Sequence, residues 1–199
     1  NGSAGNNGRL SVTIARNGDL VGEMFCTFET NAGSNLAAIA WQASAATLAD
    51  NVGGNGGPLD GCWVAERAVS DIELSIGGQR IDKHYQKWWR LYSELYLDST
   101  QKDNWGSMTS CGTHKASTTG SGRQDVVTLP LIFFFNRNPG MYLPLIALQY
   151  HEVRLDIELA SNFATYFSTS GTKVWANYIY LDTEERRRFS QKGHEYLIE

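Results

Sequence analysis

The residues best suited to metal binding or acid–base chemistry are the histidines, and their spacing does not favour a shared site. They lie far apart in the chain, at His84, His114, His151 and His194. A metal-dependent enzyme of the cupin type needs a close His-x-His pair with a Glu nearby. His151-Glu152 is not followed by a second histidine four residues later, as it is in zinc proteases. The sequence therefore predicts no metal centre and no cofactor.

Glycine clusters can cradle phosphates, and paired carboxylates can catalyse hydrolysis. Residues 53–57 and Gly77-Gly78 lack the Gly-Lys-Ser/Thr sequence that grips a phosphate, so we interpret them as a surface loop and a hairpin turn. The acidic residues alternate with apolar ones, as on the polar face of an antiparallel sheet where charges pair across strands. They are Asp71 with Glu73, and Glu152 with Asp156 and Glu158. No catalytic residue is predicted, and the protein is not expected to be an enzyme.

Aromatic side chains can stack on sugars or bases. Trp88 and Trp89 lie on an apolar helical stripe, and Phe133 and Phe135 alternate as in a strand, so packing in the core is their expected role. Phe134 points the other way, and we expect it to meet a second layer or another subunit. The alternative function is a carbohydrate-binding module, which would use exposed loop aromatics. The candidates are Trp41, Trp63 and Trp105.

Composition narrows the class of protein further. The 199 residues, 42% of them hydrophobic, suffice for one domain with its own core, and the formal charge of -4 argues against wrapping nucleic acid. Cys26, Cys62 and Cys111 show no CxxC spacing, so we interpret them as free thiols in a reducing compartment. No apolar run reaches the ~18 residues of a transmembrane helix. Asn1 begins the one Asn-x-Ser/Thr triplet, the acceptor pattern for glycosylation.

Alternation of apolar and polar residues predicts about seven strands. They cover residues 10–14, 20–28, 68–76, 79–82, 127–135, 151–159 and 173–181. Asn17-Gly18 predicts a hairpin between the first two strands, Gly77-Gly78 a tight turn, and Pro139-Gly140 a turn that ends the fifth. Residues 143–148 are apolar but ambiguous, with Pro144 suited to the first turn of a short helix.

Helical periodicity marks three shorter segments. Residues 85–96 carry a broad apolar stripe, residues 36–49 can form a short helix, and Asp182 with Glu185 predicts a capped helix through Phe189. The polar stretches 31–61 and 99–125 are expected to be long loops at the ends of the fold. The sequence thus predicts an all-β protein, an antiparallel jelly-roll β-sandwich with short helices in its connecting loops. A jelly roll has eight strands, so we expect its first strand to lie upstream of Asn1.

Several long segments, in order and spread over most of the chain, resemble the major capsid proteins of nucleocytoplasmic large DNA viruses, especially the algal-virus type. They are residues 16–20 (RNGDL), 73–82 (ELSIGGQRID) continuing to His84-Tyr85, 129–140 (LPLIFFFNRNPG), 143–153 (LPLIALQYHEV), 178–189 (YIYLDTEERRRF) and 194–199 (HEYLIE). The segments without resemblance, about 30–65 and 99–125, largely coincide with the two predicted loops.

The resemblance implies a structural protein, one half of a double jelly-roll subunit. Residues 1–183 would form the N-terminal jelly roll, and residues 184–199 the segment that leads to a second one. Such subunits form homotrimers with a nearly hexagonal outline, the capsomers of an icosahedral shell, assembled in the host cytoplasm. The implied partners are further copies of the protein and minor capsid proteins, with no direct contact to nucleic acid and no transmembrane segment.

Overall fold

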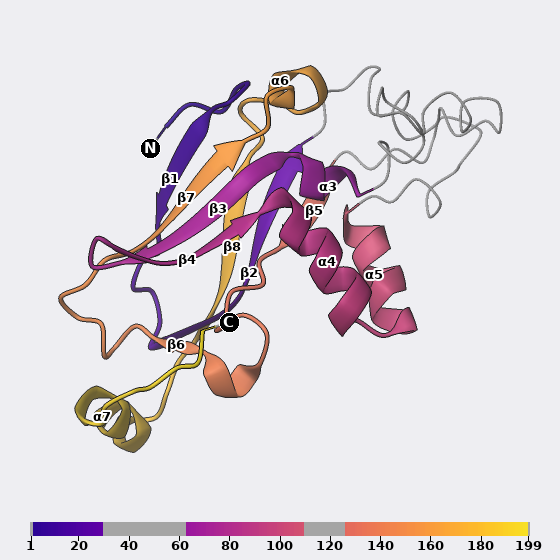
Figure 1. The fold of residues 1–199 in the computed structure, drawn as a ribbon. Coiled ribbons are helices and arrows are strands. Elements are labelled where there is room, and N and C mark those ends of the chain that lie inside the picture. The colour runs from indigo at the N-terminus through magenta and orange to yellow at the C-terminus, as the bar shows by residue number, and fades with distance from the viewer. Residues whose placement is uncertain (1, 30–62, 110–125, 199) are drawn as a thin grey trace, which may run out of the picture.

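A computed structural model describes residues 2–29, 63–109 and 126–198, and within these ranges the strands form two antiparallel sheets (Figure 1). Sheet A contains, in spatial order, β1 (Arg9–Thr13), β7 (Val153–Leu159), β3 (Val69–Ile76) and β4 (Gln79–Tyr85). All its pairings are antiparallel. Only β3 and β4 are consecutive in the chain, and the other pairs join strands that are far apart in the sequence.

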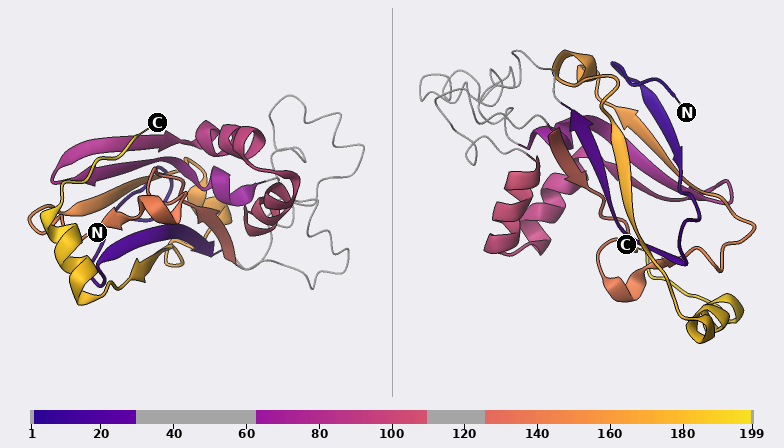
Figure 2. Two further views of the ribbon diagram at one scale, coloured as in Figure 1. Left: turned by 90° about the horizontal axis from the view of Figure 1, so that it is seen from below. Right: turned by 180° about the vertical axis from the view of Figure 1, so that it is seen from behind.

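Sheet B is centred on β2 (Leu20–Glu29), the longest strand of the described chain. Phe25 has partners in both β5 (Val126–Pro130) and β8 (Lys173–Ile179), so these two strands flank β2 on opposite edges. The two-residue β6 (Leu143–Pro144) extends the β5 side. Seen from below, β3 and β4 lie in one layer and β2 and β8 in the other (Figure 2).

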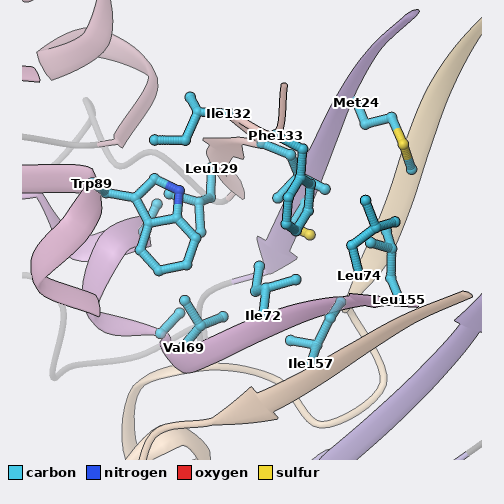
Figure 3. Close-up of a cluster of buried hydrophobic side chains, with 14 of the residues drawn as sticks. Met24, Val69, Ile72, Leu74, Trp89, Leu129, Ile132, Phe133, Leu155 and Ile157 are labelled. Atoms are coloured by element: carbon cyan, nitrogen blue, oxygen red, sulfur yellow. The ribbon is translucent and has the colours of Figure 1, made fainter. Parts of the chain in front are cut away.

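The core fills the space between the two sheets (Figure 3). Ile72, Leu74, Leu155 and Ile157 of sheet A are fully buried, and they face Met24 and Leu129 of sheet B. Burying one such side chain stabilises the fold by roughly 1.5–3 kcal/mol, so this layer supplies most of the driving force for folding. The all-β antiparallel sandwich predicted from residue alternation is confirmed.

Helices lie around the sandwich and join its strands. They are α3 (Val64–Arg67), α4 (Gln86–Tyr96), α5 (Ser99–Thr109), α6 (Phe163–Tyr166), α7 (Thr183–Gln191) and the 3-10 turn η1 (Pro139–Met141). The helices predicted near 85–96 and 183–189 are confirmed as α4 and α7, although Asp182 makes no side-chain cap. The predicted helix 36–49 lies outside the described residues. None of the described helices is long and apolar enough to span a bilayer.

The polar stretch that begins at Ser99 was predicted to be a loop, and for its first part this is wrong. Residues 99–109 form α5, which packs its buried Trp105 against the core. The indole Nε1 donates to the buried Glu66 carboxylate at 2.6 Å. The helix has almost no apolar periodicity, which is the signal that a sequence pattern would detect. It is held instead by individual contacts to other elements: this hydrogen bond, the ring contact of Trp105 with Tyr92 and the ion pair of Lys102 with Glu94.

The Asn17-Gly18 hairpin is also wrong. β1 pairs with β7 in sheet A, whereas β2 belongs to sheet B, so residues 14–19 cross from one layer to the other. Neither Asn17 nor Gly18 has the positive φ of a type I′ turn. Gly18 instead allows a close approach, because a Cβ there would lie 2.8 Å from the Cβ of Tyr178.

The strand predicted over 127–135 ends early, at Pro130. Leu131 N still donates to the carbonyl of Met24 at 2.9 Å, after which the chain leaves the sheet. Leu131 to Phe135 remain buried, and Arg137 Nε donates to the carbonyl of Ile132 at 2.7 Å. Leu143 and Pro144 form β6 and are followed by turns, so Pro144 does not begin a helix. In both segments, buried apolar residues that follow the end of a strand pack at the end of the sandwich.

Candidate assembly surfaces

The three histidines that the structure describes lie on different elements. His84 is buried in β4, His151 is exposed, His194 is half-buried after α7, and His114 lies outside the described residues. In the described parts of the chain, no three His, Cys, Asp or Glu side chains converge as a metal site would require. Cys26 is a buried free thiol, and burial raises its pKa to about 12. Cys62, Cys111 and residues 53–57 lie outside the described ranges.

His84 occupies a structural joint between β4 and α4. Its ring stacks on Phe133 with centroids 4.4 Å apart, and lies near Trp88 and Trp89. Its Nε2 atom is 3.1 Å from Asp82 Oδ2. Burial is the largest single influence and raises the pKa of Asp82, but the contact with His84, the backbone N–H of Lys83 and the charge of Arg137 together bring that pKa below its ordinary value. Ring packing and the contact with Asp82 account for the position of this histidine.

The outer face of sheet A is charged and largely self-neutralised. Lys83 Nζ lies 3.1 Å from Asp71 and 4.0 Å from Glu73, and Arg80 lies 3.9 Å from Glu73. The hydrogen bond to Asp71 raises the pKa of Lys83, although desolvation opposes it. The predicted pairing of charges across strands is confirmed for this pair of strands.

One acidic residue of β7 is not exposed on the polar face of the sheet. Asp156 is buried, because Ser11 of the neighbouring β1 donates to it and Arg154 covers it with a guanidinium 3.0 Å away. Glu152 and Glu158 on the same strand region are exposed. The three carboxylates therefore differ in environment: Asp156 is buried against Ser11 and Arg154, Glu152 accepts from Thr13, and Glu158 is exposed.

Two of the predicted turns have clear conformational reasons. Gly77 (φ 59°) and Gly78 (φ 82°) connect β3 to β4, and a Cβ on Gly77 would lie 2.7 Å from His151 Nδ1. Pro139 and Gly140 lie in η1, where the side chain of Asn138 accepts from Gly140 N at 2.9 Å. Asn1 lies outside the described residues.

The two loop tryptophans that the structure describes, Trp63 and Trp105, do not form the exposed platform that a sugar-binding module would use. Trp105 is buried in α5, and Trp63 is half-buried beneath the Arg90 guanidinium, 3.7 Å from its ring. Trp41 lies outside the described residues. The exposed ring that the alternative function would require is not found at Trp105, because the segment that carries it is a packed helix and not a loop.

An apolar row does cross the outer face of sheet B, at a place that the sequence did not single out. Trp175 of β8, Phe25 of β2 and Pro130 of β5 lie side by side in register. Trp175 is 56% exposed, and its Nε1 donates to Thr27 on the same face. Glu23 precedes the row on β2 and accepts from Asn177 at 2.9 Å. The outer faces of the two sheets therefore differ: one is charged, the other carries aromatic and apolar side chains within a polar border.

A second exposed apolar surface lies on α4. Trp89 and Ser93 face the core, whereas Leu91 and Leu95 are 50% and 67% exposed on the opposite side, so the predicted apolar stripe is only partly buried. Lys87 lies one turn before Leu91 on the same exposed line. Tyr96 is exposed but stacks on Tyr92 with ring centroids 5.2 Å apart.

The C-terminal segment closes the end of the sandwich near β6. Phe134, which was expected to meet a second layer or subunit, is buried and contacts Tyr196 of the same chain. The Tyr196 hydroxyl donates to the carbonyl of Tyr142 at 2.9 Å. Arg186 of α7 donates to Asp19 at 2.9 Å, and this hydrogen bond together with that from Leu181 N lowers the pKa of the carboxyl.

Comparison with known proteins decides the family. The family model described as "Major capsid protein N-terminus" matches residues 1–182. The chain belongs to this family. It is 41% identical to the major capsid protein of Paramecium bursaria Chlorella virus 1 over 209 aligned residues, which cover all of this chain and 42% of that protein. It is 36% identical to the major capsid protein of Pyramimonas orientalis virus, covering 96% of this chain and 44% of the relative.

Solved structures agree with this assignment to the major capsid protein family. The crystal structure of PBCV-1 VP54, fitted into a cryo-EM reconstruction of the virophage Sputnik, matches the whole chain with a TM-score of 0.71 and 36% identity. A quasi-atomic model of the PBCV-1 virus capsid matches with a TM-score of 0.72 and 37% identity. The chain covers 44% of each of these structures, and the fold is the jelly-roll sandwich of the family.

Proposed function

We propose that this chain is the N-terminal jelly roll of a major capsid subunit, the protein that builds the icosahedral shell of a large double-stranded DNA virus. The observation that carries the proposal is the family match over residues 1–182 together with 41% identity to a named major capsid protein. The chain spans less than half the length of the relatives that it matches. The assembled state is therefore proposed for the full-length protein and not for this segment alone.

In that full-length protein, residues 184–199 lead from this domain to a second jelly roll, and an additional strand precedes Asn1. With two sandwiches in each subunit, a homotrimer contains six similar domains around its axis. The capsomer therefore has a nearly hexagonal outline, and capsomers of this shape can tile a closed shell. The Asp19–Arg186 contact supports this reading of the C-terminal segment, because it fixes the helix that would direct the connection.

The proposed partners are other copies of the protein in the capsomer, neighbouring capsomers and minor capsid proteins. The proposed location is the virion shell, with assembly in the host cytoplasm. The proposed role is structural and not enzymatic. In the described residues, polar groups serve cross-strand pairs such as Lys83–Asp71 and helix contacts such as Arg186–Asp19.

The test is native mass spectrometry of the full-length protein, together with proteomics of purified virions. We expect a trimer at micromolar concentration, and an abundance in the virion that exceeds that of every other shell protein. A strictly monomeric full-length protein, or one absent from virions, would contradict the proposal.

A further inference from the structure

The Asn17-Gly18 dipeptide lies in the segment that crosses from β1 to β2, outside any strand or helix. It does not form the hairpin turn for which its sequence is suited. The same two residues allow a chemical reaction, because the main-chain nitrogen that follows an asparagine can attack the side-chain amide. Glycine in the second position has no Cβ to hinder that approach, and asparagine is among the chemically less durable residues.

The surroundings leave the two reacting groups accessible. Asn17 is exposed, and Gly18 is half-buried in a bend of the chain. Among the described residues, neither the Asn17 side chain nor the Gly18 N–H has a hydrogen-bond partner. The Gly18 nitrogen is therefore not held by a hydrogen bond that would have to open before the reaction.

A second Asn-Gly dipeptide in the described chain, Asn7-Gly8, provides the comparison. Asn7 is also exposed, but its φ is 53° and its N–H donates to the carbonyl of Ala160 at 3.1 Å. Gly8 N donates to the carbonyl of Gly5 at 2.9 Å, and the carbonyl of Gly8 accepts from Leu159 N at 2.8 Å. The two dipeptides therefore have the same sequence and similar exposure, but only the nitrogen of Gly8 is held in a hydrogen-bonded turn.

We propose that Asn17 is a site of spontaneous deamidation, and that its isoaspartyl product loosens the attachment of α7. The Gly18 nitrogen gives its proton to a solvent base and attacks Cγ of Asn17. The new N–Cγ bond closes a succinimide ring, and the Cγ–Nδ2 bond breaks as the side-chain nitrogen takes up a proton and leaves as ammonia. Water then opens the ring. Opening at Cγ gives aspartate, whereas opening at the main-chain carbonyl carbon gives isoaspartate, in which the main chain passes through Cβ and Cγ.

Isoaspartate adds one methylene group to the main chain immediately before a closely packed part of the fold. Gly18 lies so near to Tyr178 that a Cβ on the glycine would be 2.8 Å from the Tyr178 Cβ. The next residue, Asp19, is buried and accepts from Leu181 N at 2.8 Å and from Arg186 of α7 at 2.9 Å. These positions cannot all be kept when the chain before them is lengthened, so the contact between Asp19 and α7 weakens.

The experiment incubates the full-length protein in mildly alkaline buffer and follows deamidation at both dipeptides by peptide mapping with mass spectrometry. In denaturant, where the native hydrogen bonds are lost, Asn7 and Asn17 should react at rates within about threefold of each other. In the native protein, Asn17 should react at least about tenfold faster than Asn7, because the hydrogen bonds around Asn7 must open first. A native rate at Asn17 equal to or below that at Asn7 would overturn the assignment of this site.

Hydrogen-exchange mass spectrometry tests the consequence for α7 (Thr183–Gln191). In the isoaspartyl form, amides of this helix should exchange at least about tenfold faster, because a hydrogen bond between charged groups is lost. Asn17→Gln is the matched control: its longer side chain closes a ring far more slowly, so after the same incubation it should exchange like fresh wild type. Asn17→Asp carries the new charge on a main chain of normal length, and its exchange should stay within about twofold of fresh wild type.

Two results would overturn the proposed effect on α7. One is an isoaspartyl form in which α7 exchanges as it does in fresh protein. The other is an Asn17→Asp variant that exchanges as fast as the isoaspartyl form, which would assign the effect to the charge and not to the lengthened main chain. Neither result bears on the proposed function, which is decided by the trimer and by the content of the virion.

Discussion

Replacing Trp105 by Phe tests whether α5 is an integral part of the domain. Trp105 is 5% exposed, and its Nε1 donates to the Glu66 carboxylate, which is 4% exposed, at 2.6 Å. A hydrogen bond to a charged group contributes about 1.5–3 kcal/mol, and its loss leaves a buried carboxylate less well satisfied. Phenylalanine retains an aromatic ring at this position but removes the donor.

We expect Trp105→Phe to lower the free energy of local opening of α5 by about 2–3 kcal/mol. Under conditions where exchange follows the opening equilibrium, amides of residues 99–109 would then exchange about 30 to 140 times faster. Hydrogen-exchange mass spectrometry of the full-length protein measures this segment separately from the rest of the molecule.

Trp175→Phe is the matched control for this measurement. Its Nε1 also donates a hydrogen bond, to Thr27 Oγ1 at 3.0 Å, but the pair is exposed and both groups are neutral. We expect a loss of about 0.5–1 kcal/mol, or exchange about two to five times faster in β8. Equal effects of the two substitutions, or no effect of Trp105→Phe on α5, would refute the reasoning.

Three further predictions concern backbone conformation, thiol reactivity and pH. Gly77→Val should destabilise the domain by about 2 kcal/mol or more in thermal unfolding, because a β-branched residue is forced to positive φ beside His151, whereas Gly193→Ala, with open space around it, should change little. Cys26 should resist alkylation at pH 8 in the native protein and react only on unfolding, since burial raises its pKa to about 12. The pKa of the Asp19 carboxyl is lowered on folding, so its contribution to stability is present above its unfolded pKa, about 3.9, and is lost as pH falls through the lower folded value. Asp19→Asn should therefore flatten the acid side of the curve of unfolding free energy against pH. An unchanged curve would contradict this.

Local patterns predicted the elements of the fold better than their partners. The alternation of Ile72 and Leu74 with Asp71 and Glu73 identifies β3 without any knowledge of its neighbours, because strand periodicity is local. The Asn17-Gly18 hairpin failed because turn chemistry does not specify whether the chain returns to the same sheet or crosses to the other. Helix α5 was missed because it has no apolar stripe and is held by contacts to other elements, among them the hydrogen bond between Trp105 and Glu66, 39 residues apart, and the ion pair between Lys102 and Glu94.

The candidate surface shows the same limit. The row of Trp175, Phe25 and Pro130 arises from the register of three strands that are distant in the sequence. One signal was available beforehand: Val174 and Ala176 take the inward positions of β8, which leaves a tryptophan pointing outward between them. Sequence alone identifies that outward Trp, but only the pairing of strands shows that it continues across a sheet.

Cryo-EM of the virion at side-chain resolution tests the central claim most directly. We predict that the shell consists of repeated trimeric capsomers, and that the sandwich formed by residues 2–29, 63–109 and 126–198 fits the density of one jelly roll in every subunit. A shell built from a different protein, with this chain absent from its density, would contradict the account.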